Sequence, residues 1–287
     1  MVGPVIHDRA TGETYEEKVF QNRWTRFLYS TALGGVCVMA LRLPVVSAAY
    51  GLAQRTRRSR AKIPALIQEY GIDMSGCDET YDSFNDFIAR KKPTRVDPDP
   101  RHLISPADSC LLAHRIEDGT IFSIKGRDYT LASFLRDEEL AAAYEGGSFL
   151  VFRLRVYDYH RFCFIDDGRV LAHKRVHGFL DSVNSTATGR FTLTSNHREL
   201  WKLQTQNFGE VVVGEVGAML VGQIVTTHRG ARFQKGEEQG YFQFGGSTIV
   251  LVLKPDAAHL DDDILAHSAQ GVETRVRLGE KIGTRDA

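Results

Sequence analysis

Residues 241–253 read YFQFGGSTIVLVL, and this stretch indicates how the second half of the chain folds. Aromatic and β-branched residues lie on both sides of Gly245 and Gly246, as is typical of two strands joined by a turn. On this pattern alone, Gly245, Gly246 and Ser247 would form a hairpin turn, because glycine pairs are common at such turns. The stretch therefore predicts β-structure on either side of residue 246.

Similar short apolar runs recur after residue 100, and glycine-containing turns separate them. Such a pattern is typical of a mostly antiparallel sandwich or barrel. One short helix is predicted at residues 131–144. Residues 62–90 also show helical spacing of apolar side chains, and Asp82 or Ser83 can cap the segment that follows them. The predicted fold class is α+β, with N-terminal helices followed by a mostly antiparallel β-sandwich or barrel-like domain.

The first 62 residues differ in character from the rest of the chain. Residues 1–22 are polar and read as a loose lead-in, whereas residues 27–41 form an uncharged run, FLYSTALGGVCVMAL. This run is shorter than the roughly 20 residues of a membrane-spanning helix. Because arginines and a lysine flank the apolar segments, we expect residues 1–62 to form a membrane-associating helical region beside a domain at 63–287. The alternative is a pair of core helices with a solvated basic cap.

The composition excludes several classes of protein. Lys+Arg and Asp+Glu each number 36, so no overall charge points to nucleic acid. The four cysteines share no CxxC spacing, and we therefore expect neither a disulfide framework nor a metal site. Because no charged segment is followed by an apolar core and a cleavage site at the N-terminus, no secretory signal is indicated. The prediction is a protein of the reducing cytoplasm.

Four motifs, taken together, resemble one known family. They are SFNDFIARKKP at residues 83–93, DYHRF at 158–162, KGEEQGYFQFGGSTIVLVL at 235–253 and LDDDILAHSAQGVETRVRLGEKIG at 260–283. In this order they resemble bacterial phosphatidylserine decarboxylase proenzymes, in particular the form that is cleaved within a GGST motif. The resemblance extends from about residue 60 to residue 283. It implies a pyruvoyl-dependent carboxy-lyase that is made as a zymogen.

The resemblance also implies roles for particular residues. In this family the serine hydroxyl attacks the preceding carbonyl, and the resulting ester is converted to a pyruvoyl group. Carried over, Ser247 attacks Gly246, which leaves a β chain of residues 1–246 and an α chain of residues 247–287. The pyruvoyl group forms a Schiff base with the substrate amine and withdraws electrons as CO2 leaves. Asp108, in SPADS, matches the orienting carboxylate, and His160 is the expected proton donor.

Three positions depart from the family pattern. Cys163 replaces the second histidine of the HRxH motif, which is generally assigned as the base for cleavage. Ser109 stands where the family has glycine, and Gln223 where it has serine. A thiol acts as a base only when ionised, which is a minority state at neutral pH. Three possibilities therefore remain open. Another histidine is the base, namely His160 or one of His114, His173, His177 and His228. Otherwise Cys163 acts weakly as the base, or the chain is processed poorly.

The expected activity is conversion of phosphatidylserine to phosphatidylethanolamine and CO2 at the cytoplasmic face of the cell membrane, by a peripheral protein of phospholipid biosynthesis. The expected partners are phosphatidylserine, an anionic membrane surface, the α and β chains of one precursor, and a second copy in a homodimer. No nucleic acid is expected. Two alternatives remain: a related pyruvoyl-dependent decarboxylase of a soluble amino acid, and a poorly processed homologue that binds lipid.

Overall fold

The structure, a computed structural model, describes most of the chain. It covers residues 3–17, 51–78, 80–124, 127–178, 193–217, 223–243 and 247–285. The apolar run predicted to associate with membranes, residues 27–41, lies outside these described residues, and so do Gly245 and Gly246. In the part that is described, no helix is long and apolar enough to cross a membrane.

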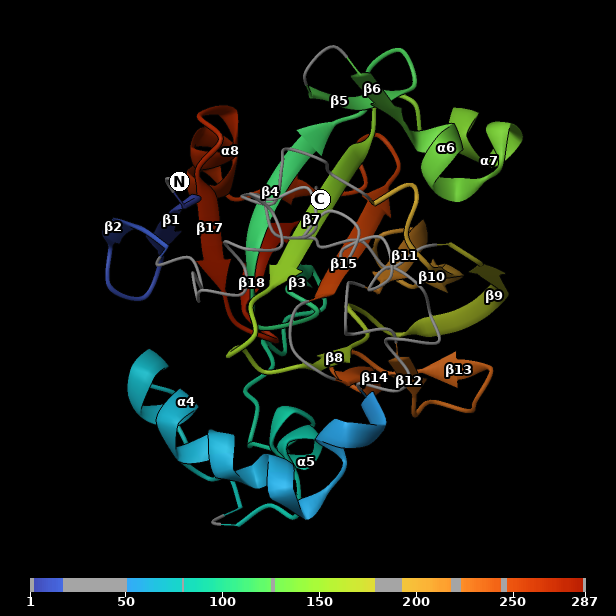
Figure 1. Ribbon diagram of the computed structural model, residues 1–287. Helices are drawn as coiled ribbons and strands as arrows, with labels where there is room; N and C mark the ends of the chain where they lie inside the picture. Colours follow the sequence, from blue (N-terminus) through green and yellow to red (C-terminus); the bar gives the residue numbers. More distant parts are fainter. Residues whose placement is uncertain are drawn as a thin grey trace, which may run out of the picture.

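A ten-stranded sheet forms the centre of the molecule (Figure 1). Its neighbours are antiparallel except for β1 and β17, which run parallel. In spatial order the strands are β13 (Arg232–Phe233), β9 (Gly168–Val176), β10 (Arg198–Thr205), β11 (Glu210–Val216), β15 (Ser247–Leu253), β7 (Ser148–Leu154), β4 (Ser109–Arg115), β17 (Glu273–Val276), β1 (Val5–Asp8) and β2 (Glu13–Glu16).

Three smaller sheets surround this large sheet. The one that matters for the site contains β12 (Gln223–Thr226), β14 (Glu238–Gln243) and β8 (Arg161–Cys163). The others are β16 (His259–Leu260), β18 (Lys281–Thr284) and β3 (His102–Ile104), and the pair β5 (Thr120–Ile124) and β6 (Arg127–Thr130). The predicted α+β class with mostly antiparallel sheets is confirmed. The large sheet ends in the edge strands β13 and β2, so it is open.

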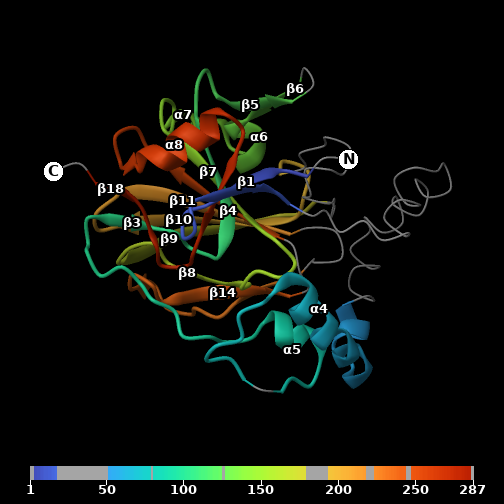
Figure 2. The same cartoon turned by 90° about the vertical axis from the view of Figure 1, so that its left-hand side faces the viewer.

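Strand β15 is buried along its whole length because it is covered on both faces. Ile249 and Leu251 point into a core that also contains Phe162 and Phe242 of the small sheet. Val250 points into a second core with Phe134, on the opposite face. Figure 2 shows this layering, with β14 lying between the large sheet and helices α4 and α5. A continuous apolar run therefore marks a central strand between two cores.

The helices are short and lie at the two ends of the molecule. The 3-10 helix η1 (Arg57–Lys62), α4 (Ile63–Tyr70) and α5 (Phe84–Ile88) lie at the β14 end, while α6 (Leu131–Leu135), α7 (Glu138–Ala142) and α8 (Asp262–Ala269) lie at the other (Figure 1). The helical prediction for residues 62–90 holds only at its ends, because Gly71 stops α4 with a left-handed φ of 57°. Ser83 caps α5 by accepting from the amide of Asp86.

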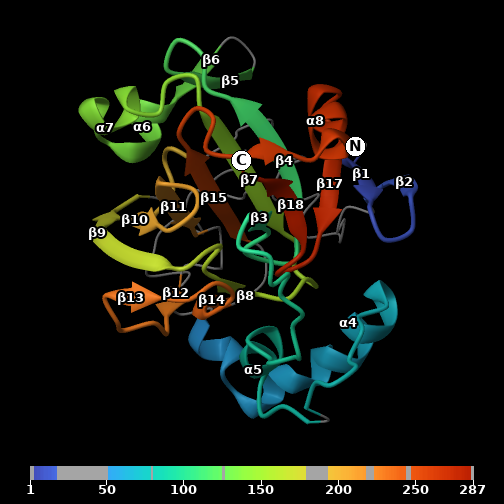
Figure 3. The same cartoon turned by 180° about the vertical axis from the view of Figure 1, so that it is seen from behind.

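The N-terminus departs from the predicted loose lead-in. Strands β1 and β2 form a hairpin at the edge of the large sheet, and β1 pairs with β17 from the far end of the sequence (Figure 3). Arg9, in the hairpin turn, donates to Asp261 and Asp263 at 2.8 and 2.7 Å. The polarity of this segment thus reflects ion pairing with the C-terminal residues. For residues 3–17, the prediction of a loose lead-in is wrong.

Candidate active site

Ser247 is the first residue of β15, and it pairs with Leu154 of β7. Since side chains alternate along a strand, Ser247 shares the face of Ile249, which looks toward the small sheet. The serine is fully buried, and its Oγ has no hydrogen-bond partner among the described residues. Buried hydroxyls are nearly always hydrogen-bonded, so this atom requires an explanation. An internal nucleophile would provide one.

The small sheet brings the histidine motif beside the segment that precedes Ser247. Strand β14 ends at Gln243 and pairs with β8, which follows His160. The amide of Phe242 donates to the carbonyl of His160 at 3.0 Å. Strand β14 of the small sheet therefore ends at Gln243, beside the histidine motif, and β15 of the large sheet begins at Ser247. Figure 1 shows β14 and β15 in these two separate layers.

His160 is fully buried in a defined tautomer. Its Nδ1 lies 2.9 Å from the carbonyl oxygen of Asp158, and because a carbonyl only accepts, Nδ1 carries the proton. The lone pair is therefore on Nε2. Burial lowers the pKa of His160 to about 4, although the nearby charge of Asp158 opposes this shift. At neutral pH the imidazole is uncharged and can accept a proton.

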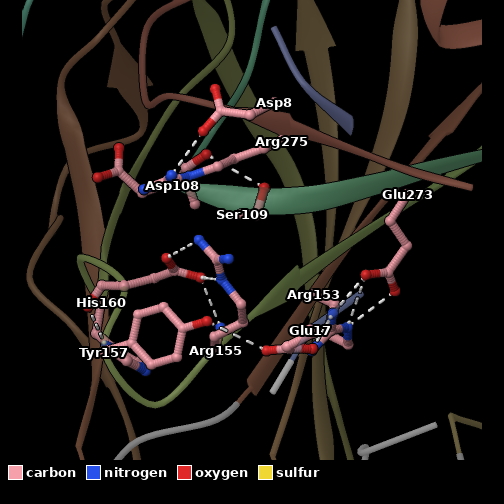
Figure 4. A network of polar contacts seen from close by, with 12 residues as sticks. Asp8, Glu17, Asp108, Ser109, Arg153, Arg155, Tyr157, His160, Glu273 and Arg275 are labelled. Carbon is pink, nitrogen blue, oxygen red and sulfur yellow. Dashed lines mark hydrogen bonds and ion pairs between the residues drawn. The ribbon is translucent and has the colours of Figure 1, made fainter. Parts of the chain in front are cut away.

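Asp158 fixes this motif with its side chain as well as its carbonyl. Its carboxylate accepts from Arg155 Nε at 2.9 Å and from Nη2 at 2.8 Å, and both residues are buried. Beside them, Arg153 contacts both Glu17 and Glu273 (Figure 4). Bidentate pairs of this kind restrict side-chain geometry strongly. The histidine is consequently held by a network that extends from the N-terminal segment to the C-terminal segment.

Asp108 lies near both motif residues, as the resemblance requires. Its Oδ1 accepts from the amide of Leu278 at 2.8 Å, and its Oδ2 contacts Lys92 Nζ. Its negative charge raises the pKa of both His160 and Cys163. In addition, the amide of Cys163 donates to the carbonyl of Pro106 at 3.0 Å, which joins β8 to the loop that carries Asp108. The structure thus brings these three predicted residues together.

Cys163 is a protonated thiol in this environment. Burial, and secondarily the charge of Asp108, raise its pKa to about 12. A thiol with such a pKa is almost entirely uncharged at neutral pH and does not act as a base. Of the other two departures, Gln223 begins β12, and the hydroxyl of Ser109 donates to the carbonyl of Ala107 at 3.3 Å.

The histidines considered as substitutes lie in different places. His114 is opposite Phe149, which belongs to the core on the far face of the sheet from Ser247. His228 is 2.7 Å from Glu237 through Nδ1. His173 is on the inner face, where its Nε2 lies 2.6 Å from Glu199 and its ring stacks on Trp201. The ring of His177 lies 5.6 Å from that of His197.

Sequence reasoning missed Lys92 and Glu215. Lys92 forms an ion pair with Asp108. Glu215 is fully buried on β11, where its Oε1 accepts from Gln239 Nε2 of β14 at 2.8 Å. Burial, reinforced by the charge of Glu199, raises the pKa of Glu215 to about 8. One signal was available in the sequence: Glu215 is a single charge within the apolar run VVVGEVGAMLV, at residues 211–221.

The geometry of the site itself indicates a class of protein. A buried serine begins a central strand directly after two glycines. A neutral imidazole lies in the next layer, just before β8, and the carboxylate of Asp108 lies just before β4 of the same large sheet. This arrangement is typical of proteins that use a serine as an internal nucleophile.

Comparisons with known proteins agree with this class. The family model described as phosphatidylserine decarboxylase matches residues 84–284, and the chain belongs to that family. A phosphatidylserine decarboxylase proenzyme 2 of Clostridium acetobutylicum is 42% identical over 97% of each chain. Proenzymes of Ruminiclostridium cellulolyticum and Fusobacterium nucleatum are 38% and 37% identical, covering 97% and 96% of this chain and 96% of each relative. These matches support neither the soluble amino acid alternative nor the non-catalytic one.

Proposed function

We propose that the chain cleaves itself between Gly246 and Ser247 and then decarboxylates phosphatidylserine to phosphatidylethanolamine. The observation that supports this most directly is the buried Oγ of Ser247, which has no hydrogen-bond partner in the described part of the chain. No other described residue therefore holds this oxygen by a hydrogen bond, which leaves it available to attack the carbonyl of Gly246. Relatives at 37–42% identity are named as proenzymes, which agrees with this step.

The site fits a pyruvoyl group derived from Ser247. That position is buried between the two layers, with His160 just before β8 of the facing sheet and Asp108 just before β4 of the large sheet. When present, the group supplies a ketone that binds the substrate amine and accepts the electron pair released with CO2. The surrounding apolar core excludes water, which protects a reactive carbanion.

His160 is the proposed proton carrier of the decarboxylation step. Its Nε2 is the atom that would carry the proton, because Nδ1 is bound to the carbonyl of Asp158. Once protonated, His160 is a stronger acid than an ordinary imidazolium, since burial lowers its pKa to about 4. It would therefore return the proton efficiently to the carbon that has lost CO2. Asp158 keeps the ring in the required tautomer by accepting from Nδ1.

A membrane-facing surface lies close to this site. Arg57, Arg58, Arg60 and Lys62, in or beside η1, are exposed. Just before them, Arg55 donates to the side chain of Gln243 at 2.6 Å, at the end of β14. Cations at this position would attract an anionic lipid surface to the end of the molecule that contains β14. This placement supports a peripheral, cytoplasmic-side protein that acts on lipid within the bilayer. A homodimer remains part of the proposal.

Intact-mass analysis of the purified protein tests the cleavage, and CO2 release from phosphatidylserine in mixed micelles tests the activity. We expect a fragment of residues 247–287 with a blocked N-terminus. Ser247→Ala should remain at full length and release no CO2, because no other residue can supply the ketone. A wild-type chain that stays intact after long incubation would contradict the proposal.

A further inference from the structure

Glu215 lies on the strand next to Ser247 and on the same face of the sheet. The pairing of β11 with β15 places Glu215 directly opposite Ile249. Ser247 is two residues from Ile249, so its side chain points in the same direction. Diagonal neighbours of this kind are about 7–8 Å apart, within reach of a long side chain such as glutamate. Figure 1 shows β11 and β15 side by side.

Both side chains contain an unused polar atom. Oε1 of Glu215 accepts from Gln239, but within the described ranges Oε2 has no hydrogen-bond partner, and neither does Ser247 Oγ. Each such atom costs about 1–3 kcal/mol when buried. Because the two atoms are not within direct hydrogen-bond distance of each other, one water between them on this inner face would satisfy both.

The groups around Glu215 keep it protonated at neutral pH. Glu199 faces it from β10 and repels its charge, while the Glu199 carboxylate itself contacts His173 and Arg175 of β9. From β14, only the neutral side chain of Gln239 is bonded to it among the described residues. The indole of Trp201 favours the carboxylate, although its N–H has no hydrogen-bond partner in that same part of the chain. The nearest titratable residues of β8 and its flank, Cys163 and His160, are both uncharged near pH 7.

We propose that Glu215 is the base that accepts the hydroxyl proton of Ser247 during self-cleavage, the role that the family pattern assigns to a histidine at position 163. The inference rests on the proposed self-cleavage at Gly246. The pKa of Glu215, about 8, is nearer to neutrality than the pKa values of Cys163 and His160. Glu215 is therefore better suited to proton transfer at pH 7–8.

The reaction balances without any further reactant. The Glu215 carboxylate takes the proton as Oγ bonds to the carbonyl carbon of Gly246. The bond from that carbon to the nitrogen of Ser247 then breaks, and the proton passes to the departing nitrogen. The product is an ester with a free amine on residue 247, and Glu215 is again a carboxylate. Later elimination of the ester is a separate step in which Glu215 has no assigned role.

The test is a time course of cleavage for freshly translated full-length chain between pH 6 and pH 9. The wild-type rate should rise about tenfold per pH unit below about pH 8 and then level off, as the carboxylate fraction does. Glu215→Gln keeps the shape and the contact with Gln239, but it should slow cleavage by about 10²–10⁴-fold and abolish the pH dependence.

Glu199→Gln is the matched variant, because it removes a second buried carboxylate one strand further from Ser247. Loss of the Glu199 charge should lower the pKa of Glu215, so this chain should still cleave, with its pH profile shifted to lower pH. If the wild type cleaves and Glu215→Gln cleaves at the same rate, the role of Glu215 is overturned, but the proposed function is not. A wild type that never cleaves would overturn the proposed function as well.

A second measurement does not depend on activity or on the folding of one variant. In uncleavable Ser247→Ala, infrared difference spectra should show the C=O stretch of a protonated carboxyl that disappears with a midpoint near pH 8. The band should be missing from the Ser247→Ala, Glu215→Gln double variant. Absence of a carboxyl that titrates between pH 6 and pH 9 in Ser247→Ala would overturn the proposal.

Discussion

Burial acts on three residues around Ser247 in the same direction, toward the uncharged form. It lowers the pKa of His160 to about 4, raises that of Glu215 to about 8 and raises that of Cys163 to about 12. The residue types respond differently because a histidine is charged when protonated, whereas a carboxyl and a thiol are charged when ionised. One dry environment therefore produces a proton acceptor, a weak acid and an inert thiol.

A histidine introduced at position 163 should accelerate self-cleavage. A neutral imidazole beside Asp108 would supply a second base, and the gain should be largest in Glu215→Gln, up to about 10²–10⁴-fold. Cleavage of Cys163→His is followed by gel densitometry in both backgrounds. Cys163→Asn is the control, since it adds similar polar bulk without a base. If neither background responds, position 163 is not in contact with the reaction.

Loss of His160 should affect the second reaction more than the first. His160→Ala removes the neutral imidazole that we assign to proton transfer, so chains that are already cleaved should release CO2 about 10²–10⁴-fold more slowly. The measurement compares CO2 release by the intact complex per mole of fragment 247–287 that it contains, so that incomplete processing does not affect the rate. An unchanged rate in the cleaved fraction would remove His160 from the mechanism.

The raised pKa of Glu215 also predicts how stability depends on pH. The folded protein binds this proton more tightly than the unfolded chain, so the stabilisation is complete below about pH 4.5 and is lost as pH rises toward 8. The total effect is on the order of 5 kcal/mol. In denaturant unfolding of Ser247→Ala, Glu215→Gln should therefore reduce the loss of stability between pH 6 and pH 9. Parallel curves for the two chains would contradict this.

Sequence motifs predicted roles for Ser247, Asp108 and His160 because these residues occur in short recognisable strings. Glu215 and Lys92 could not be predicted in that way. Each is recognised only by its contact with a distant segment, Gln239 for Glu215 and Asp108 for Lys92. Likewise, only the folded environment reveals that the Cys163 thiol has a pKa of about 12.

At the scale of elements, the strand predictions succeeded where one run of sequence determined the outcome. Strand β15 is apolar throughout, and it occupies the centre of the sheet. The hairpin of β1 and β2 was not predictable, because its polar residues are stabilised by partners more than 250 residues away. The predicted helix at residues 131–144 is instead two short helices, since Arg136 adopts a left-handed conformation and Asp137 caps α7.

The ion pairs of the N-terminal hairpin should contribute measurably to stability. Arg9 is mostly buried, with 18% of its side chain exposed, and it contacts Asp261, Asp263 and Glu280. Arg9→Ala should cost about 1–3 kcal/mol because three partly exposed carboxylates lose a shared hydrogen-bond donor. Arg101→Ala is the control, since Arg101 is 70% exposed and pairs with Asp99 alone among described residues. If the two variants lose equal stability in thermal unfolding, the contacts of Arg9 contribute no more than an exposed ion pair.

At the scale of the whole molecule, a group of exposed cations lies at one end, and we propose that this end faces a membrane. The exposed cations of η1 lie at the end with α4 and α5, while α6 lies at the opposite end (Figure 1). Most of the relatives' length is matched, so the N-terminal region is shared with them and is not an addition to this chain. Such a region would position the site against lipid while the large sheet remains in water.

Liposome flotation tests this orientation. Arg57→Gln combined with Arg60→Gln should weaken binding to anionic vesicles by about 2 kcal/mol, or about 30-fold, because each cation near the surface contributes about 1 kcal/mol. Added salt should reduce the difference between this variant and wild type. Arg115→Gln with Arg136→Gln removes the same charge at the far end and should have little effect. Similar losses from both pairs would indicate nonspecific attraction.

The position of β15 has a consequence for the life of the cleaved protein. After cleavage, β15 and β17 belong to residues 247–287, and each lies between two strands of residues 1–246. The two pieces are interleaved, so neither can leave without dismantling the sheet. The product is a heterodimer whose two subunits come from the same precursor chain and do not exchange with those of other copies. A defective large piece and a defective small piece, produced from separate copies, should therefore fail to complement one another.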